Sequence, residues 1–152
     1  MEPQLIEERK SFLLAGLSER YNNQAVEGIP AQWQRFVPYI AKVPGQVGWT
    51  TYGVCFNMDT AGNMDYMCGV EVSTSSALPE GLSELRVAEQ LYAVFFHRDH
   101  ISKIRDTWDG AFLWVRMSGR KLVKAPQVEA YGEGFNAQTG NGGVEIWIPV
   151  ER

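Results

Sequence analysis

A chain of 152 residues, 45% hydrophobic and 21% charged, is long enough to bury a core and has the composition of one globular domain. Its 18 acidic residues outnumber 14 basic ones, for a formal net charge of −4, and no basic run interrupts this balance. Affinity for nucleic acid comes from clustered lysine and arginine, so we expect no direct binding to nucleic acid. The N-terminus lacks an apolar signal segment, and no apolar stretch approaches the ~20 residues that span a bilayer. We therefore expect a cytoplasmic protein without membrane contact.

The first half of the chain predicts a strand, a helix and a hairpin, in that order. Residues 11–17 form an apolar run typical of a strand. Helical spacing of apolar residues begins at Ile29, Pro30 suits a first helical turn, and Pro38 ends or kinks the helix near Val37. Two β-rich segments, 50–58 and 65–73, flank the turn sequence DTAGN and predict a hairpin. The polar start, residues 21–28 and the connector 73–85 are expected to be loops.

The second half repeats these elements. Residues 90–96 predict a strand, Asp99 is a good N-cap for the helix that follows, and Gly119 ends that helix. Segments 127–135 and 144–150 flank a Gly- and Asn-rich turn and predict a second hairpin. The apolar face of the helix is expected to carry Ile101, Ile104, Trp108, Phe112 and Val115.

Residues at matching places strengthen the repetition. Trp33 and Trp108 occupy the two helices, Tyr52-Gly53 matches Tyr131-Gly132, and the run GVEV at 69–72 matches GVEI at 143–146. Matching elements in the same order predict an internal duplication, with halves of about 1–76 and 84–152 inside a single domain, 1–152. Each half alone has a small core, so we expect the two to pack together as an α+β fold.

Five ordered segments, IPAQWQRF, TYGVCFN, MDYMCGVEV, APQVEAYGEGF and GGVEIWIPV, resemble the GyrI-like domains. Such domains also serve as effector-binding domains of AraC-type and MerR-type multidrug-responsive regulators. The resemblance implies tandem strand-helix-strand-strand units, with an antiparallel sheet, helices on one face and a ligand groove on the other. Regulators of this kind carry a separate helix-turn-helix region. Because this domain takes up the 152 residues, we expect a stand-alone form that acts, if it regulates, through a DNA-binding partner.

The same resemblance implies a pocket carboxylate in a Pro-x-x-Glu-x-Tyr context, which Pro126, Glu129 and Tyr131 match in full. In multidrug-binding members this carboxylate pairs with cationic ligands among aromatic side chains. The resemblance therefore implies a small organic cation as the ligand of this chain.

Strand alternation extends the candidate site. Side chains of a strand alternate between faces, so Glu129 and Tyr131 oppose the aliphatic residues of their strand, as do Glu145, Trp147 and Glu71 in theirs. If the aliphatic sides pack on the helices, all five candidates share the open face. Aromatic walls with carboxylates suit an organic cation, because ring faces contribute roughly 0.5–2 kcal/mol of cation–π attraction. For any single glutamate, an ordinary solvated sheet face is an equal explanation.

The favoured function is capture of hydrophobic cations, as a sensor or a sequestering protein, with Trp114 at the groove rim and Trp33 and Trp108 in the core. Two alternatives stay open. Some family members resemble hydrolases of strained alkylating compounds, for which Glu129 and Tyr131 provide a general base and a hydroxyl. The family also includes a protein that restrains DNA gyrase, which implies a possible protein partner.

Other reactive residues predict no further chemistry. Cys55 and Cys68 lie in apolar runs without metal-ligand spacing and are expected to be buried thiols, although adjacent strands would allow a disulfide. His97 and His100 flank Asp99, where capping and a solvated helix end explain them. The glycines of NAQTGNGG have no strand-to-helix setting, so they predict a hairpin turn. We therefore expect no metal, no cofactor and no assigned catalytic residue.

Overall fold

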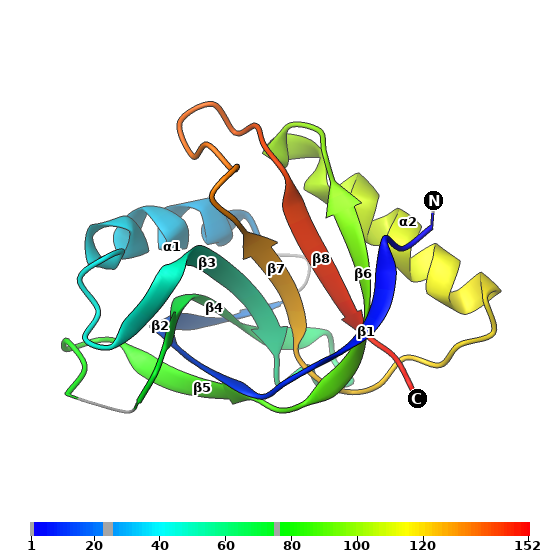
Figure 1. Cartoon of the computed structure of the whole chain (residues 1–152), viewed down its shortest axis with the longest axis horizontal. Helices are drawn as coiled ribbons and strands as arrows, with labels where there is room; N and C mark the ends of the chain where they lie inside the picture. The colour runs from blue at the N-terminus through cyan, green and yellow to red at the C-terminus, as the bar shows by residue number, and fades with distance from the viewer. Residues whose placement is uncertain (1, 23–25, 75–76) are drawn as a thin grey trace.

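Eight strands form one antiparallel sheet in the computed structural model, which describes residues 2–22, 26–74 and 77–152 (Figure 1). Two α-helices, α1 (Ile29–Phe36) and α2 (Ile104–Met117), lie against it. Short 3₁₀ turns adjoin them at Val26–Gly28, Val37–Tyr39 and Ile101–Lys103. The strands are β1 (Leu5–Arg9), β2 (Phe12–Asn22), β3 (Gln46–Phe56), β4 (Asn63–Val72), β5 (Ser83–Val87), β6 (Gln90–His97), β7 (Gln127–Tyr131) and β8 (Val144–Pro149).

The strand order is β1-β6-β8-β7-β3-β4-β2-β5. Strands β2, β3 and β4 with α1 make one half, and β6, β7 and β8 with α2 make the other, which confirms the expected α+β fold of strand-helix-strand-strand units. The halves join where β3 pairs with β7, Thr51 opposite Tyr131. The two edge strands lie at opposite ends of the sheet. The N-terminal strand β1 pairs with β6 of the second half, and β5 pairs back with β2 of the first half.

The edge strands β1 and β5 correct the sequence prediction, which left both segments as loops. Both are five residues long, are largely polar, and have three exposed residues each, so they lack a strand-like alternation. Their pairing with β6 and β2 supplies the structure that their sequence does not. Strand β2 is also longer than expected and includes Tyr21 and Asn22. Residues 23–25 and 75–76 of the expected loops lie outside the described residues.

Helix α1 begins and ends as its prolines predict. Pro30 sits in its first turn, where a missing N–H costs no hydrogen bond, and Pro38 lies in the 3₁₀ turn that follows Phe36. The helix buries Phe36 and Gln32. The Gln32 amide donates to the carbonyls of Leu17 and Tyr66, at 2.9 Å each, which ties α1 to β2 and β4.

Helix α2 has a different cap from the one expected. The Asp99 carboxylate accepts the adjacent amide of His100, at 2.7 Å, and pairs with Lys103, whereas the His100 ring accepts the amide of Ser102. The first helical turn is therefore a 3₁₀ turn capped by His100, and the assignment of Asp99 as N-cap is wrong. Gly119, with φ +81°, follows the helix end as predicted.

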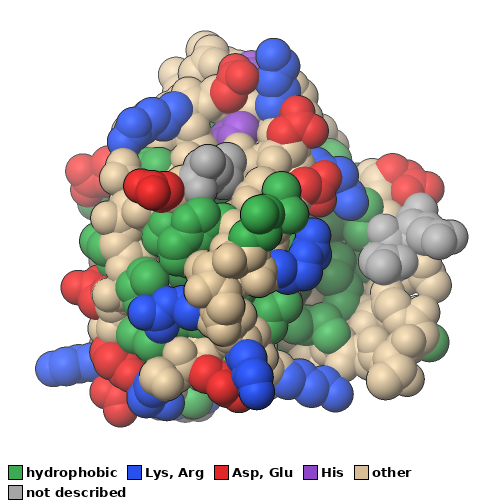
Figure 2. Space-filling view, turned by 90° about the vertical axis from the view of Figure 1, so that its right-hand side faces the viewer, with side chains coloured by type: hydrophobic (Ala, Val, Ile, Leu, Met, Phe, Trp, Pro, Cys, Tyr) green, Lys and Arg blue, Asp and Glu red, His purple; other side chains and the backbone are tan. Residues whose placement is uncertain are grey.

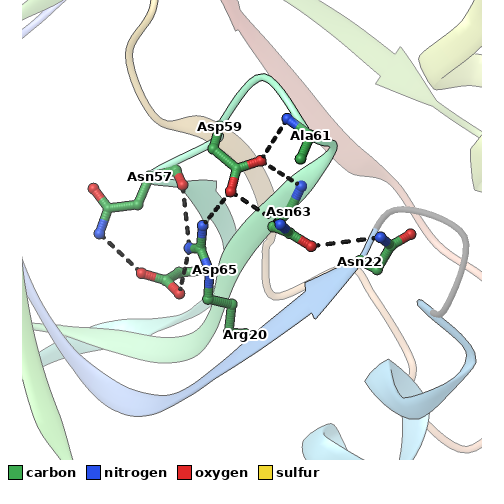
Figure 3. A network of polar contacts seen from close by, with 7 residues as sticks. All are labelled: Arg20, Asn22, Asn57, Asp59, Ala61, Asn63 and Asp65. Carbon is green, nitrogen blue, oxygen red and sulfur yellow. Dashed lines mark hydrogen bonds and ion pairs between the residues drawn. The ribbon is translucent and has the colours of Figure 1, made fainter.

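The β3–β4 hairpin is held by a network around Asp59 (Figure 3). The Asp59 carboxylate accepts the amides of Ala61 and Asn63, both at 2.9 Å, which closes the turn predicted at this sequence. The Arg20 guanidinium from β2 pairs with Asp59 at 3.0 Å and with Asp65 at 3.1 Å. Hydrogen bonds from Asn63, then from Ala61 and Arg20, lower the pKa of Asp59 to about 2.

The sheet curls into a half-barrel, so that both of its faces are covered (Figure 1). Its outer face packs on the helices: β2 and β4 against α1, and β6 and β8 against α2. Its inner face closes on side chains from seven strands, a layer that we call the inner core. Its buried members are Leu14, Val54, Met67, Val87, Tyr92, Val94, Val128, Ala130 and Trp147.

Both cysteines are free thiols beneath α1, Cys68 buried and Cys55 partly so. Burial raises the pKa of each thiol, and the negative charge of Glu129 adds to this. They are the small apolar residues that their sequence context predicts.

Among the helices within the described ranges, none is both long and apolar enough to cross a bilayer.

Candidate functional site

Glu129 projects from β7 toward the side of the sheet that carries the helices, and three aromatic side chains bind its carboxylate. The hydroxyls of Tyr66 and Tyr131 donate to its Oε1, at 3.0 Å and 2.8 Å. The indole N–H of Trp108, on α2, donates to its Oε2 at 2.8 Å. Strands β4 and β7 and helix α2 thus each contribute a side chain that contacts one carboxylate. We call Glu129 and its three donors the Glu129 site.

A second layer extends the aromatic surroundings to α1. The Trp33 indole donates to the Tyr66 hydroxyl at 3.0 Å, and its ring meets that of Tyr131 edge-on at 5.3 Å. Phe135, after β7, packs on Tyr131 at 5.0 Å. Both helices therefore reach Glu129 through a tryptophan, directly from α2 and through Tyr66 from α1.

Gly53 makes room for this arrangement. It lies opposite Glu129 in the β3–β7 pair. A Cβ there would fall 2.1 Å from the Tyr66 hydroxyl oxygen and 2.8 Å from Glu129 Oε1, both shorter than any ordinary contact. The site thus depends on a residue without a side chain at the position paired with Glu129.

Burial is the main electrostatic influence on the site. It raises the pKa of Glu129, and the hydrogen bonds from Trp108, Tyr131 and Tyr66 oppose that rise. Burial, followed by the nearby negative charge of Glu129, raises the pKa of both tyrosines well above the usual value, so they stay protonated donors. No lysine or arginine of the described chain forms an ion pair with Glu129, so the carboxylate has hydrogen-bond donors but no counter-ion.

The expectation that five candidates share one face is wrong. Directly paired residues of neighbouring strands share a face, and Glu129 pairs with Ile146, whereas Val128 pairs with Trp147. Glu129 and Tyr131 therefore lie on the outer face with the helices. Glu145 and Trp147 lie on the inner face, and so does Glu71, which pairs with Leu14 of the inner core.

The physical reason is that Val128 and Ala130 belong to the inner core and not to the helix layer. An aliphatic alternation identifies a buried face, but in a curled sheet both faces are buried. Tyr52 and Tyr131 also lie on opposite faces, since Tyr52 pairs with Ala130, so the proposed match between these two tyrosines fails. The duplication itself stays a prediction.

His97 lies elsewhere than expected, and Trp114 packs on the sheet. Trp114 packs beneath α2 against Phe95, with ring centroids 5.9 Å apart. His97 is buried, and its ring nitrogens contact the Thr107 hydroxyl at 2.6 Å and the His100 carbonyl at 2.8 Å, so the expected solvated position is wrong for His97. In the ranges that the structure describes, no three His, Cys, Asp or Glu side chains are grouped as a metal site would require.

Sequence reasoning missed three contributors to the Glu129 site. Trp33 and Trp108 were expected only in the core; both do pack against it, and each also donates a hydrogen bond toward Glu129. Tyr66 was not singled out. Tyr66 lies an even number of residues from Val70 and Val72 on the same strand, so its side chain points to the same face. Because those valines were expected to face the helices, the same alternation would have placed Tyr66 on the helix side.

The side of the molecule that carries α2 has hydrophobic side chains gathered at its centre, with charged ones around them (Figure 2). The surface is hollowed beside this central mass, and hydrophobic side chains line the hollow (Figure 2). Helix α2 has two large exposed apolar side chains, Leu113 and Met117.

Comparison with known proteins agrees with this geometry. The model of the GyrI-like small molecule binding domain matches residues 1–151. The chain belongs to this family. It is 26% identical over 148 residues to the transcriptional regulator BrlR of Pseudomonas aeruginosa, covering 95% of the chain. It spans about half of that relative, 54% of its length.

Two solved structures resemble this GyrI-like domain over nearly its whole length. One, of SAV2435 bound to tetraphenylphosphonium, has 25% identity and a TM-score of 0.81, covering 99% of this chain and 94% of the other. A putative transcription regulation protein from Staphylococcus aureus MU50 has 24% identity and a TM-score of 0.79, with 100% and 99% covered. The latter likeness shows a shared fold.

Proposed function

We propose that this GyrI-like domain captures a hydrophobic organic cation at the Glu129 site, between α1 and α2. The observation that carries the proposal is a partly buried carboxylate without a counter-ion, bound by Tyr66, Tyr131 and Trp108. A carboxylate in such surroundings attracts a cation more strongly than one in water, because the effective dielectric constant is lower. Aromatic ring faces add cation–π attraction and apolar contact area.

Capture changes the partners of the carboxylate without making or breaking a covalent bond. A quaternary cation such as tetraphenylphosphonium has no hydrogen-bond donor, so it pairs with Glu129 by charge while the rings of Trp33 and Trp108 contact its apolar groups. If the cation displaces the Trp108 indole from Glu129, the ionic interaction between the cation and the carboxylate compensates for the lost hydrogen bond. Because α1 and α2 both reach Glu129, a ligand there alters the contacts of both helices.

The comparisons support both the ligand class and the biological role. Tetraphenylphosphonium, bound to the similar SAV2435, is a hydrophobic cation. The similarity to BrlR supports a role as the effector-sensing part of transcription regulation, working with a DNA-binding partner in the cytoplasm. Sequestration of the ligand would need the same capture step but no DNA-binding partner.

Binding of tetraphenylphosphonium, measured by calorimetry and thermal shift, tests the proposal. At 100 times the Kd, a ligand adds about 2.7 kcal/mol of stability, and each kcal/mol raises the Tm of a domain of this size by roughly 2–4 °C. We expect the parent to show such a shift and Glu129→Gln to lose it.

Two controls sharpen the test. Glu145→Gln removes a carboxylate from the opposite face of the sheet, so it is expected to bind like the parent. Tetraphenylborate has the same shape with a negative charge and is expected not to bind. Equal binding of the anion, or an unchanged Glu129→Gln variant, would refute a charge-based site.

Hydrolysis is the second candidate, favoured by the raised pKa of Glu129 and its 2.8 Å hydrogen bond with Tyr131. A carboxylate with a raised pKa is a stronger base. Turnover distinguishes the two functions: unchanged ligand at one equivalent supports capture, and product beyond one equivalent of a strained alkylating substrate supports hydrolysis.

A further inference from the structure

The inner face of the sheet carries a second cluster of aromatic and acidic residues, separated from the Glu129 site by the sheet itself. Trp147 lies at its centre. The rings of Phe12, Tyr52 and Tyr92 surround it at centroid distances of 6.0, 6.2 and 5.6 Å. Phe12 and Tyr52 also contact each other, at 5.4 Å.

Two carboxylates accompany these rings. Glu145 Oε1 accepts the indole N–H of Trp147 at 2.9 Å. Glu71 lies on the same face, and no hydrogen bond or ion pair ties it to another described residue. Tyr52 pairs with Gly69 on β4, two residues from Glu71, and Glu145 and Tyr52 both pair with Ala130, so the three side chains share this face. Burial, then the charges of Glu71 and Glu145, raises the pKa of Tyr52 to about 12.

A cation of the chain itself already occupies this cluster. The guanidinium of Arg9, at the end of β1, lies 4.6 Å from the centroid of the Trp147 ring. Its positive charge also acts on the Tyr52 hydroxyl, against the effect of Glu71 and Glu145. The contact is of the cation–π type, for which arginine over tryptophan is a preferred pair.

Arg9 is held loosely by other polar groups. Its Nε is buried and lies 3.0 Å from Glu7 Oε2, close enough for an ion pair but not aligned as a hydrogen bond. Both residues belong to β1, a five-residue edge strand that pairs only with β6. Because β1 pairs with no strand other than β6, Arg9 is attached to the sheet through a single edge pairing.

We propose that Trp147, Tyr52, Glu145 and Glu71 form a second cation site, with Arg9 as its built-in occupant, for small guanidinium or alkylammonium groups. A free cation of this class competes with Arg9 and so loosens β1. The inference is independent of the proposed function, because the two carboxylate sets lie on opposite faces of the sheet.

Chemical rescue of Arg9→Ala by methylguanidinium, the head group of arginine, tests the site. We expect Arg9→Ala to unfold at a lower temperature than the parent, and 10 mM methylguanidinium to restore at least half of the loss. The parent, whose site is filled, is expected to show no increase in Tm. Arg152→Ala is the matched control, since it removes an exposed arginine that pairs with Glu8 of the same strand. It is expected to show no rescue.

Second-site variants identify where the rescuing cation binds. The rescue should disappear in Arg9→Ala combined with Glu71→Gln and Glu145→Gln, and persist in Arg9→Ala combined with Glu129→Gln. Rescue that survives loss of the inner carboxylates, or that fails when only Glu129 is changed, overturns the proposal. So does an Arg9→Ala variant that is folded and destabilised but insensitive to methylguanidinium.

A measurement on the parent covers the case in which Arg9→Ala does not fold. Excess methylguanidinium should accelerate hydrogen exchange at least tenfold at the β1 amides paired with β6, relative to equal sodium chloride, and leave α2 unchanged. Equal exchange in the two salts would refute competition at Arg9.

Discussion

At the scale of single residues, Glu129 combines two opposing influences. Burial favours its neutral form, and three hydrogen bonds favour the charged form. The net effect raises its pKa, so the folded protein holds the proton to a higher pH than an exposed glutamate of pKa about 4.3. A partly protonated carboxylate binds a cation less well, which links ligand affinity to pH.

We expect the affinity for tetraphenylphosphonium to fall as the pH decreases through the raised pKa of Glu129, toward tenfold per pH unit below it. Calorimetry between pH 4.5 and 8 measures this. The stability of the ligand-free protein depends on pH in the opposite direction. The folded state binds the proton of Glu129 more tightly than the unfolded state, so this residue favours folding at low pH. That contribution is lost as the pH rises from the ordinary glutamate value through the raised one. An affinity that stays constant down to pH 4.5 would contradict the role of Glu129 as the carboxylate that binds the cation.

At the scale of elements, the site depends on the pairing of β3 with β7, which sets Gly53 opposite Glu129. Gly53→Ala would place a Cβ 2.1 Å from the Tyr66 hydroxyl oxygen, so Tyr66 or Glu129 must move. We expect an at least tenfold loss of tetraphenylphosphonium affinity and a loss of stability of about 1–3 kcal/mol, the usual cost of overpacking. Gly132→Ala is the control, because a Cβ there meets no atom within 4 Å. Chemical denaturation and calorimetry of both variants decide the matter, and equal affinities would show that the close approach is unimportant.

The elements also show how far the sequence alone leads. Helix α1, the end of α2 and both hairpins follow from proline, glycine and apolar spacing, which act locally. The carboxylate Glu129 was predicted through its family context. Its side of the sheet was not, because the apolar side chains of Val128 and Ala130 suit either buried face. Only the pairing of Val128 with Trp147 settles which face they share. Such register depends on distant segments, which a local pattern does not contain.

At the scale of the whole molecule, the inner core joins the two halves. Val54 on β3 and Val128 on β7 are paired, fully buried, and contributed by different halves. Each half therefore completes its core with side chains of the other, and neither helix layer is separate from this shared interior. A domain built in this way should unfold as one cooperative unit, in spite of its repeated element order.

A double-mutant cycle tests that dependence. We expect Val54→Ala and Val128→Ala each to lower the free energy of unfolding by about 2 kcal/mol, since each removes two buried methyl groups and leaves a cavity. The cavities adjoin, so the double variant should depart from the sum by at least about 0.5 kcal/mol. Urea denaturation followed by near-ultraviolet circular dichroism and by tryptophan fluorescence should give coincident single transitions, because Trp33 and Trp108 lie in different halves. Separate transitions, or strictly additive losses, would mean that the halves fold independently and that the shared core does not couple them.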